Sequence, residues 1–285
     1  MSTKLLLSAD TPCDIGAELQ KRYDVQLFPL HIQLGSKTYT DGLDINNEAL
    51  YDAWRKERLL PKTAAINPEE YINYFRPFIE DGFEILHISL GSGLSCCYQN
   101  AVIAASELGH VRVIDSRNLS SGFGHLVCEA GERINAGYSL DQIVGEVEAL
   151  VPMVSASFVL DTLEFMHAGG RCSNFAQLGA TLMRLKPSIE VLQSQCGGMV
   201  VGRKYIGKLD SALKKYVSDQ LKDRTDIVLD RAFITHTCPD RALPEEIAEL
   251  VLKLQPFREL HITRASCTIG SHCGPNTLGV LFLRK

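Results

Sequence analysis

The sequence, 285 residues long, lacks the features that would mark a membrane, secreted or nucleic-acid-binding protein. No apolar run approaches the roughly 18 residues needed to span a bilayer. Only three consecutive apolar residues, Leu5–Leu7, stand near the start, too few for a signal peptide. The net charge of −5 argues against general binding of nucleic acid or of an anionic membrane surface. We therefore expect a soluble, cytoplasmic protein with no nucleic-acid partner and no stable membrane insertion.

Signatures of metal and nucleotide chemistry are missing as well. None of the nine cysteines forms a C-x-x-C pair, and no Cys and His set has zinc-like spacing. Reduced thiols and no metal site are the simplest expectation. Neither G-x-G-x-x-G nor G-x-x-x-x-G-K-[ST] is present, so any ATP chemistry would have to come from a partner.

What the sequence does contain indicates a well-packed α/β protein. Hydrophobic residues make up 45% of the chain and charged residues 22%. Candidate strands alternate with candidate helices throughout, which is typical of the α/β class. A change in character near Pro152 predicts two α/β domains, residues 1–152 and 153–285.

Local signals place several elements. The segments Asn67–Glu70 and Ser139–Gln142 match capping boxes, so a helix is expected after each. One strand is expected over residues 25–34. Loops are expected over residues 62–66 and 268–275, and a helix from Asn174 to about Arg184.

A strand, a Ser/Gly turn and a helix follow one another in the first half. Ile85–Ile88 is expected to be a buried strand, Ser89–Leu94 a turn, and the helix to begin near Ser95. The first N–H groups of a helix lack partners within it and favour negative charge, so this arrangement predicts an anion site. Ser92 and Ser95 would add hydroxyl donors. A second polar loop, after Val111–Ile114, would lie at the same sheet edge if the strands are parallel.

Asp10 follows the first strand, a common place for a site in open α/β sheets. The alternative is that Asp10 or Asp14 only caps the next helix, which is expected to end near Arg22.

Motifs along the whole chain resemble the DegV family of bacterial lipid-binding proteins, which includes the fatty-acid-binding subunits of fatty acid kinase. The motifs that carry the resemblance are Ser8–Thr11 with Asp14, Tyr39–Gly42, Thr63 after Pro61, Ser92–Ser95 with Tyr98 and Gln99, Val113–Ser116 with Gly122 and Gly124, Leu163–Phe165 with Gly169–Arg171, and Ile269–Pro275 with Gly279. Their order and spacing together are more specific than any one of them.

The resemblance implies two α/β domains with the ligand between them. It implies a long-chain fatty acid whose carboxylate is held by Thr63 and the Ser92/Ser95 turn. It places Arg171 and His272 near the carboxylate, where they help a separate kinase to phosphorylate it. By the same resemblance the protein is a carrier rather than an enzyme, with no cofactor apart from the bound fatty acid.

Each of these residues also has a purely structural interpretation. Ser92 and Ser95 could serve as turn and N-cap residues, and Arg171 could clamp a loop through a carbonyl. His272 could be a hydrogen-bonded histidine between the domains. Where the family has other residues, this chain has Ala64–Ala65, Cys96–Cys97 and Cys172, and all three changes touch the walls of the expected site.

Two kinds of enzyme remain as alternatives. A serine hydrolase would use Ser92 or Ser95 as nucleophile, His272 as base and Asp115 as the orienting acid. The turn does not match G-x-S-x-G, which a nucleophile elbow requires. A reactive Cys96 or Cys97 in the first turn of the helix is the other alternative, against a role as small buried fillers.

Overall fold

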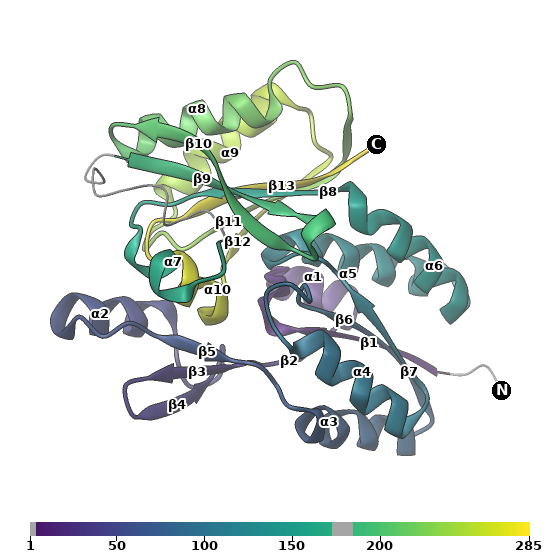
Figure 1. The fold of residues 1–285 in the computed structure, drawn as a ribbon. Helices are drawn as coiled ribbons and strands as arrows, with labels where there is room; N and C mark the ends of the chain where they lie inside the picture. The colour runs from purple at the N-terminus through teal and green to yellow at the C-terminus, as the bar shows by residue number, and fades with distance from the viewer. Residues whose placement is uncertain (1–3, 173–184) are drawn as a thin grey trace.

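The computed structural model describes residues 4–172 and 185–285, so the helix expected from Asn174 lies outside the described residues. Strands and helices alternate in both halves of the chain, which confirms the α/β class. Figure 1 shows the N-terminal half below and the C-terminal half above, with α5 and α10 where the two halves meet.

The main sheet of the N-terminal half is parallel, with strand order β2-β1-β6-β7. Because its strands are parallel, the loops that follow β1, β6 and β7 leave from one edge. Its strands are β1 (Lys4–Asp10), β2 (Gln26–Phe28), β6 (Phe83–Ser89) and β7 (Val111–Asp115). The helices of this half are α1 (Gly16–Arg22), α2 (Asn47–Glu57), α3 (Pro68–Glu80), α4 (Cys97–Leu108), α5 (Ser120–Asn135) and α6 (Leu140–Leu150).

A small antiparallel sheet, order β4-β3-β5, corrects two expectations. It contains β3 (His31–Leu34), β4 (Lys37–Thr40) and β5 (Lys62–Ala64). The single strand expected over 25–34 is wrong, because the chain breaks at Pro29, which has no N–H to continue a ladder. The loop expected over 62–66 contains β5, which pairs with β3 from a distant part of the chain.

The sheet of the C-terminal half has the order β10-β9-β8-β13-β11-β12 and is mainly antiparallel, with β11 and β12 parallel. Its strands are β8 (Val154–Val159), β9 (Leu185–Leu192), β10 (Gly198–Ile206), β11 (Ile227–His236), β12 (Glu259–Arg264) and β13 (Leu278–Arg284). Its helices are α7 (Glu164–Gly169), α8 (Leu209–Leu221), α9 (Ala242–Leu254) and α10 (Cys267–Cys273).

The loop expected over 268–275 is wrong, because most of it forms helix α10. Ser266 caps this helix by accepting a hydrogen bond from the Ile269 N–H. Gly270 suggested a loop, but a Cβ at this position would lie 1.9 Å from Asn47 Oδ1. The glycine therefore allows α2 to pack closely on α10 and is not needed for a turn.

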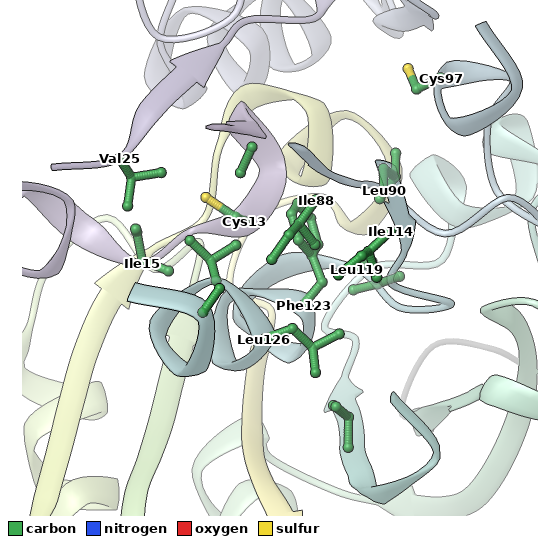
Figure 2. Close-up of a cluster of buried hydrophobic side chains, with 14 of the residues drawn as sticks. Cys13, Ile15, Val25, Ile88, Leu90, Cys97, Ile114, Leu119, Phe123 and Leu126 are labelled. Atoms are coloured by element: carbon green, nitrogen blue, oxygen red, sulfur yellow. The ribbon is translucent and has the colours of Figure 1, made fainter. Parts of the chain in front are cut away.

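Helix α5 joins the two halves. It contacts β1 and β6 on one side and β8, β11 and β13 on the other. Figure 2 shows Phe123 and Leu126 of this helix among buried side chains from the loops and strands around it. One hydrophobic cluster extends from β1 to β13 through α5. The division of the chain at residue 152 into two domains therefore stays a prediction, although β8 begins close by at Val154.

Candidate functional site

A cavity of about 350 Å³ lies between the two halves of the chain. Most of its wall is apolar, and polar side chains interrupt it at a few places. The apolar lining residues include Leu30, Ala65, Leu90, Leu94, Leu119, Met199 and Ile269. The polar lining residues are Thr63, Ser92, Ser95, Arg171, Thr268 and His272. All five side chains expected to form the site therefore line one cavity, and Figure 2 shows Leu90 and Leu119 on the same side of the adjoining core.

Thr63 and His272 form the polar contact that joins the two halves at this cavity. Thr63 lies on β5 and His272 in the last turn of α10, and Thr63 Oγ1 is 2.9 Å from His272 Nε2. Burial and, to a smaller extent, the nearby charge of Arg171 together lower the pKa of His272 to about 4. The imidazole is therefore neutral near pH 7, and it can act as a hydrogen-bond donor or acceptor but not as a cation.

The second ring nitrogen of His272 is buried and has no hydrogen-bond partner among residues 4–172 and 185–285. A Cβ on Gly169 would lie only 2.3 Å from this nitrogen, Nδ1. Gly169 therefore leaves the space that the imidazole ring occupies. This contact gives a physical reason for a glycine beside Arg171 in the sequence.

Arg171 is exposed and lines the cavity. Its Nη1 donates a hydrogen bond to the carbonyl oxygen of Gly169 at 2.6 Å. The loop-clamp interpretation therefore describes one of its contacts. A guanidinium has further N–H donors, so this bond does not exhaust its capacity.

The donors of Ser92 are engaged within the protein. Its backbone N–H and its hydroxyl both donate to the Asp115 carboxylate, at 3.0 and 2.6 Å. Asp115 also accepts the Arg117 N–H at 2.9 Å. The two polar loops do meet at one sheet edge, as the sequence predicts. Their contact fixes the shape of the turn and leaves Ser92 no free donor.

Ser95 lies at the start of α4, which begins at Cys97, two residues later than expected. Its oxygen accepts the Cys97 N–H at 3.3 Å, and its hydroxyl lies 3.2 Å from Cys97 Sγ. A thiol is a weak acceptor, so this hydroxyl is easily redirected to a ligand.

The two neighbouring cysteines differ. Cys97 is buried, and its burial, with the negative charge of Asp10, raises the pKa of its thiol to about 12. This agrees with a filler role and not with a nucleophile. Cys96 is exposed and lines the cavity, so the expectation that it is buried is wrong.

Asp10 anchors Ser89 and Leu90, the first residues of the Ser/Gly turn. The sequence pointed to Asp10 as a possible site residue but not to this role. Its carboxylate accepts hydrogen bonds from Tyr71 Oη, Ser89 Oγ and the Leu90 N–H, at 2.7 to 2.8 Å. Burial alone would raise its pKa, but the hydrogen bond and charge of His87, with the other donors, lower it. The helix-capping interpretation is wrong, because α1 has Ile15 at its N-cap and no side-chain cap.

Asp14 and Asp41 anchor the start of α10, and Asp41 was not identified from the sequence as a functional residue. Asp14 accepts the Ser266 N–H at 2.9 Å, and Asp41 accepts the N–H groups of Cys267 and Thr268 at 2.8 and 3.0 Å. In the sequence, Asp14 stands only as an acidic residue after the motif Ser8–Thr11, and Asp41 as one within Tyr39–Gly42. Both residues hold the helix that carries His272.

The geometry does not support the hydrolase alternative. Asp115 bonds directly to Ser92, whereas His272 bonds to Thr63. Among the residues that the structure describes, no hydrogen bond joins His272 to Ser92, Ser95 or Asp115. A serine hydrolase requires the serine to contact the histidine and the histidine to contact the acid. The described residues do not make these contacts.

The described residues contain neither a cluster of metal ligands nor a membrane-spanning helix. Over residues 4–172 and 185–285, no three or more His, Cys, Asp or Glu side chains gather as metal ligands would. Over the same residues, none of the helices has the length and apolarity to cross a membrane.

Comparisons with known proteins agree with this fold. A solved DegV family protein from Thermus thermophilus, described by its fatty acid binding, is 26% identical, with a TM-score of 0.87 over 99% of this chain and 100% of that one. The structure of DegV from Bacillus subtilis, described as a fatty acid binding protein, is 23% identical and has a TM-score of 0.80 over 100% of both chains. At that identity the second likeness shows the fold alone.

A DegV domain-containing protein of Caldanaerobacter subterraneus is 30% identical over 285 residues, with 99% of each chain covered. The family model described as "Uncharacterised protein, DegV family" matches residues 4–285. The chain therefore belongs to the DegV family.

Proposed function

We propose that this protein binds one long-chain fatty acid in the cavity between its two halves, with the carboxylate at Thr63, Ser95 and His272. The observation that carries the proposal is the cavity itself, whose apolar wall is interrupted by these hydroxyl and imidazole groups. The Thermus thermophilus relative, described as binding fatty acid, supports the ligand class. No cofactor is needed for binding, and the protein acts as a carrier rather than as an enzyme.

The donors can be assigned atom by atom. In the tautomer with its proton on Nε2, His272 donates to Thr63 Oγ1, and the Thr63 hydroxyl is free to donate to the carboxylate. Ser95 turns its hydroxyl from Cys97 Sγ to the second carboxylate oxygen. Ser92 contributes indirectly, because its bonds to Asp115 hold the turn that presents Ser95.

Orientation and affinity have different sources. Hydrogen bonds to a charged group contribute about 1.5–3 kcal/mol each. A water-sized group occupies about 30 Å³ and a methylene is similar, so the cavity holds about a dozen such groups. At about 0.8 kcal/mol per buried methylene, the tail supplies about 10 kcal/mol before ordering costs. The polar groups therefore orient the ligand, and the apolar wall provides most of the affinity.

Native mass spectrometry of protein purified from cells tests the proposal. We expect a co-purifying mass of fatty-acid size. Thr63→Val and Ser95→Ala should each weaken binding about tenfold or more, because each removes a donor to a charged group. Ser106→Ala is the matched control, since Ser106 is exposed on α4 and its hydroxyl donates to the Val102 carbonyl of the same helix. A ligand-free mass after gentle purification would contradict the proposal.

The same proposal includes delivery of the carboxylate to a separate kinase. Arg171 is exposed beside the cavity, and a guanidinium suits bidentate contact with a phosphate. His272 lies next to the proposed carboxylate position and holds the Thr63 hydroxyl, which donates to the ligand oxygen as the acyl phosphate forms. The sequence has no nucleotide-binding motif of its own, so ATP would be bound by the partner.

A coupled assay with a fatty acid kinase catalytic subunit tests this step. Acyl phosphate is trapped with hydroxylamine, while fatty-acid binding is measured in parallel. We expect His272→Ala to reduce phosphoryl transfer more than lipid binding. Equal losses in the two measurements would count against the role of His272 in transfer.

A further inference from the structure

A second, much smaller cavity of about 20 Å³ adjoins the first. The two cavities share three lining residues, Leu119, Ile269 and Cys273. Leu119 immediately precedes α5, while Ile269 and Cys273 are four residues apart on α10 and so face the same way. We call these three residues the neck, and the two spaces the front and rear chambers. The neck contains residues from both halves of the chain, Leu119 from the first and Ile269 and Cys273 from the second.

The rear chamber has several hydroxyl groups in its wall, but each of them is engaged elsewhere. Ser120 donates to Asp14 at 2.6 Å, and Thr235 bonds the hydroxyls of Ser121 and Thr263 at 2.5 and 2.8 Å. Hydroxyls farther round the wall donate to backbone carbonyls, Thr237 to that of Gly274 and Thr277 to that of Cys273. The wall therefore presents methyl and ring surfaces to the chamber.

The remaining ring in the wall is neutral. His236 accepts the Cys238 N–H at Nδ1, and burial lowers its pKa to about 4. Phe158 and Leu281 supply apolar wall from β8 and β13. Leu281 faces this side because neighbouring residues of a strand alternate, and Phe282 packs into the opposite core under α8 and α9. A space of this size and lining takes about one methyl-sized group and suits no polar one.

We propose that the rear chamber receives the methyl end of the fatty-acid tail, and that the neck and Leu281 set the longest chain the protein accepts. This inference rests on the proposed function. The front chamber holds about a dozen carbon-sized groups, so a longer chain must pass the neck. Its terminal methyl group then lies against Leu281 and Phe158. Each methylene that fits changes affinity about fourfold, which makes the position of the back wall a sensitive measure of chain length.

Two variants test the inference in opposite directions. Leu281→Phe fills the rear chamber, and Ile269→Ala widens the neck. Leu283→Phe is the control for the first, since it makes the same change two residues along the strand, on the same face but outside the chamber wall. Each protein is loaded from an equimolar mixture of lauric, myristic, palmitic and stearic acids, and native mass spectrometry measures the acids retained.

We expect Leu281→Phe to lower the ratio of myristic to lauric acid about fourfold, the effect of excluding the one carbon-sized group that the rear chamber takes. Ile269→Ala should raise that ratio severalfold, and Leu283→Phe should leave it unchanged. Retention of fatty acid with the same ratio in Leu281→Phe and Ile269→Ala would overturn the inference and leave the proposed function standing. No retained acid in the unmodified protein would overturn both.

Discussion

Helices α4 and α10 both begin at the cavity, but they differ in whether carboxyl groups of the protein accept hydrogen bonds from their first N–H groups. At α10 the N–H groups of Ser266, Cys267 and Thr268 all bond to buried carboxylates of the chain. At α4 the N-cap Cys96 provides no side-chain cap, and the described contact is that of the Cys97 N–H with Ser95. An external anion can use a helix start only where the protein has not filled it, so α4 is where the proposed carboxylate fits.

The start of α10, whose N–H groups bond to carboxyl groups of the chain, has an electrostatic cost. The start of α4, which we call the open start, avoids that cost. Burial, only partly offset by hydrogen bonds from Ser120 and Ser266, raises the pKa of Asp14 to about 7. Burial also raises the pKa of Asp41, again against several hydrogen bonds. These two carboxylates hold α10, and the far end of α10 carries His272. The chain thus uses its own carboxyl groups to position His272 and leaves the start of α4 for a ligand.

The largest expected effect comes from removing the anchor of α10. Asp41→Ala leaves the N–H groups of Cys267 and Thr268 and the Thr268 hydroxyl without an acceptor. We expect a loss of about 3 kcal/mol in the free energy of unfolding, measured with urea, and weaker fatty-acid binding because His272 moves. Asp44→Ala is the control, since Asp44 is exposed and accepts one described N–H, from Thr40. Similar small losses in both variants would show that Asp41 is not an anchor.

The second prediction concerns pH. An Asp in an unfolded chain has a pKa of about 3.9, but the pKa of Asp14 in the folded protein is about 7. Between these values the folded protein keeps a proton that the unfolded chain has released, so its stability falls as pH rises. Asp14→Asn should remove about 2 kcal/mol of this fall from about pH 5 to about pH 7. Urea unfolding at several pH values measures it.

For that comparison the exposed Asp24→Asn is the control and should keep the slope of the unmodified protein. Identical pH dependence in Asp14→Asn and the unmodified protein would mean that Asp14 ionises normally. The comparison of the two helix starts would then lose its electrostatic basis.

The third prediction tests the far end of α10 without touching its start. Gly169→Ala places a methyl group against His272 Nδ1 and should displace the imidazole from Thr63. We expect about a tenfold loss of fatty-acid affinity, comparable to losing one hydrogen bond to a charged group, with little change in stability. Gly145→Ala, in α6, where an added Cβ would meet nothing within 4 Å, is the matched control and should bind normally. Unchanged affinity in Gly169→Ala would separate His272 from binding.

The smallest effect compares cysteines at the two helix starts. Cys96 is exposed at the open start, whereas Cys97 and Cys267 are buried, each with a thiol pKa raised to about 12 by burial. A thiol-specific alkylating reagent should modify Cys96 much faster than the other two. Bound palmitic acid should slow that reaction a few-fold, because Cys96 lines the cavity. Peptide mapping by mass spectrometry gives the rates, and equal rates with and without lipid would place the ligand elsewhere.

Local signals were sufficient for many elements. Asn67 and Glu70 exchange the expected capping-box bonds at 2.9 and 2.8 Å, and Ser139 with Gln142 repeats the pattern. Both pairs were predictable because each bond joins residues only three positions apart. Strand β5 and helix α10 were missed, since β5 exists through its pairing with β3 and α10 is anchored by residues from the start of the chain.

For the candidate site, the sequence supplied the residue types, and motif resemblance supplied their grouping. The sequence could not show that Ser92 donates to Asp115, nor that Thr63 contacts His272, which lies 209 positions away in the chain. Such contacts depend on where two strands end and how two halves of the chain are docked. The three neck residues are equally hidden, because nothing in their local sequence separates them from ordinary core residues.

The sequence by itself determined the α/β class, most helix starts and the set of polar groups available to a ligand, because hydrophobic periodicity and capping act over a few residues. Only the tertiary structure decided which helix start remains open, which serine keeps a donor, and which residues the two cavities share. Those outcomes depend on hydrogen bonds and packing between segments far apart in the chain, and a buried polar group takes whichever partner the fold brings within reach.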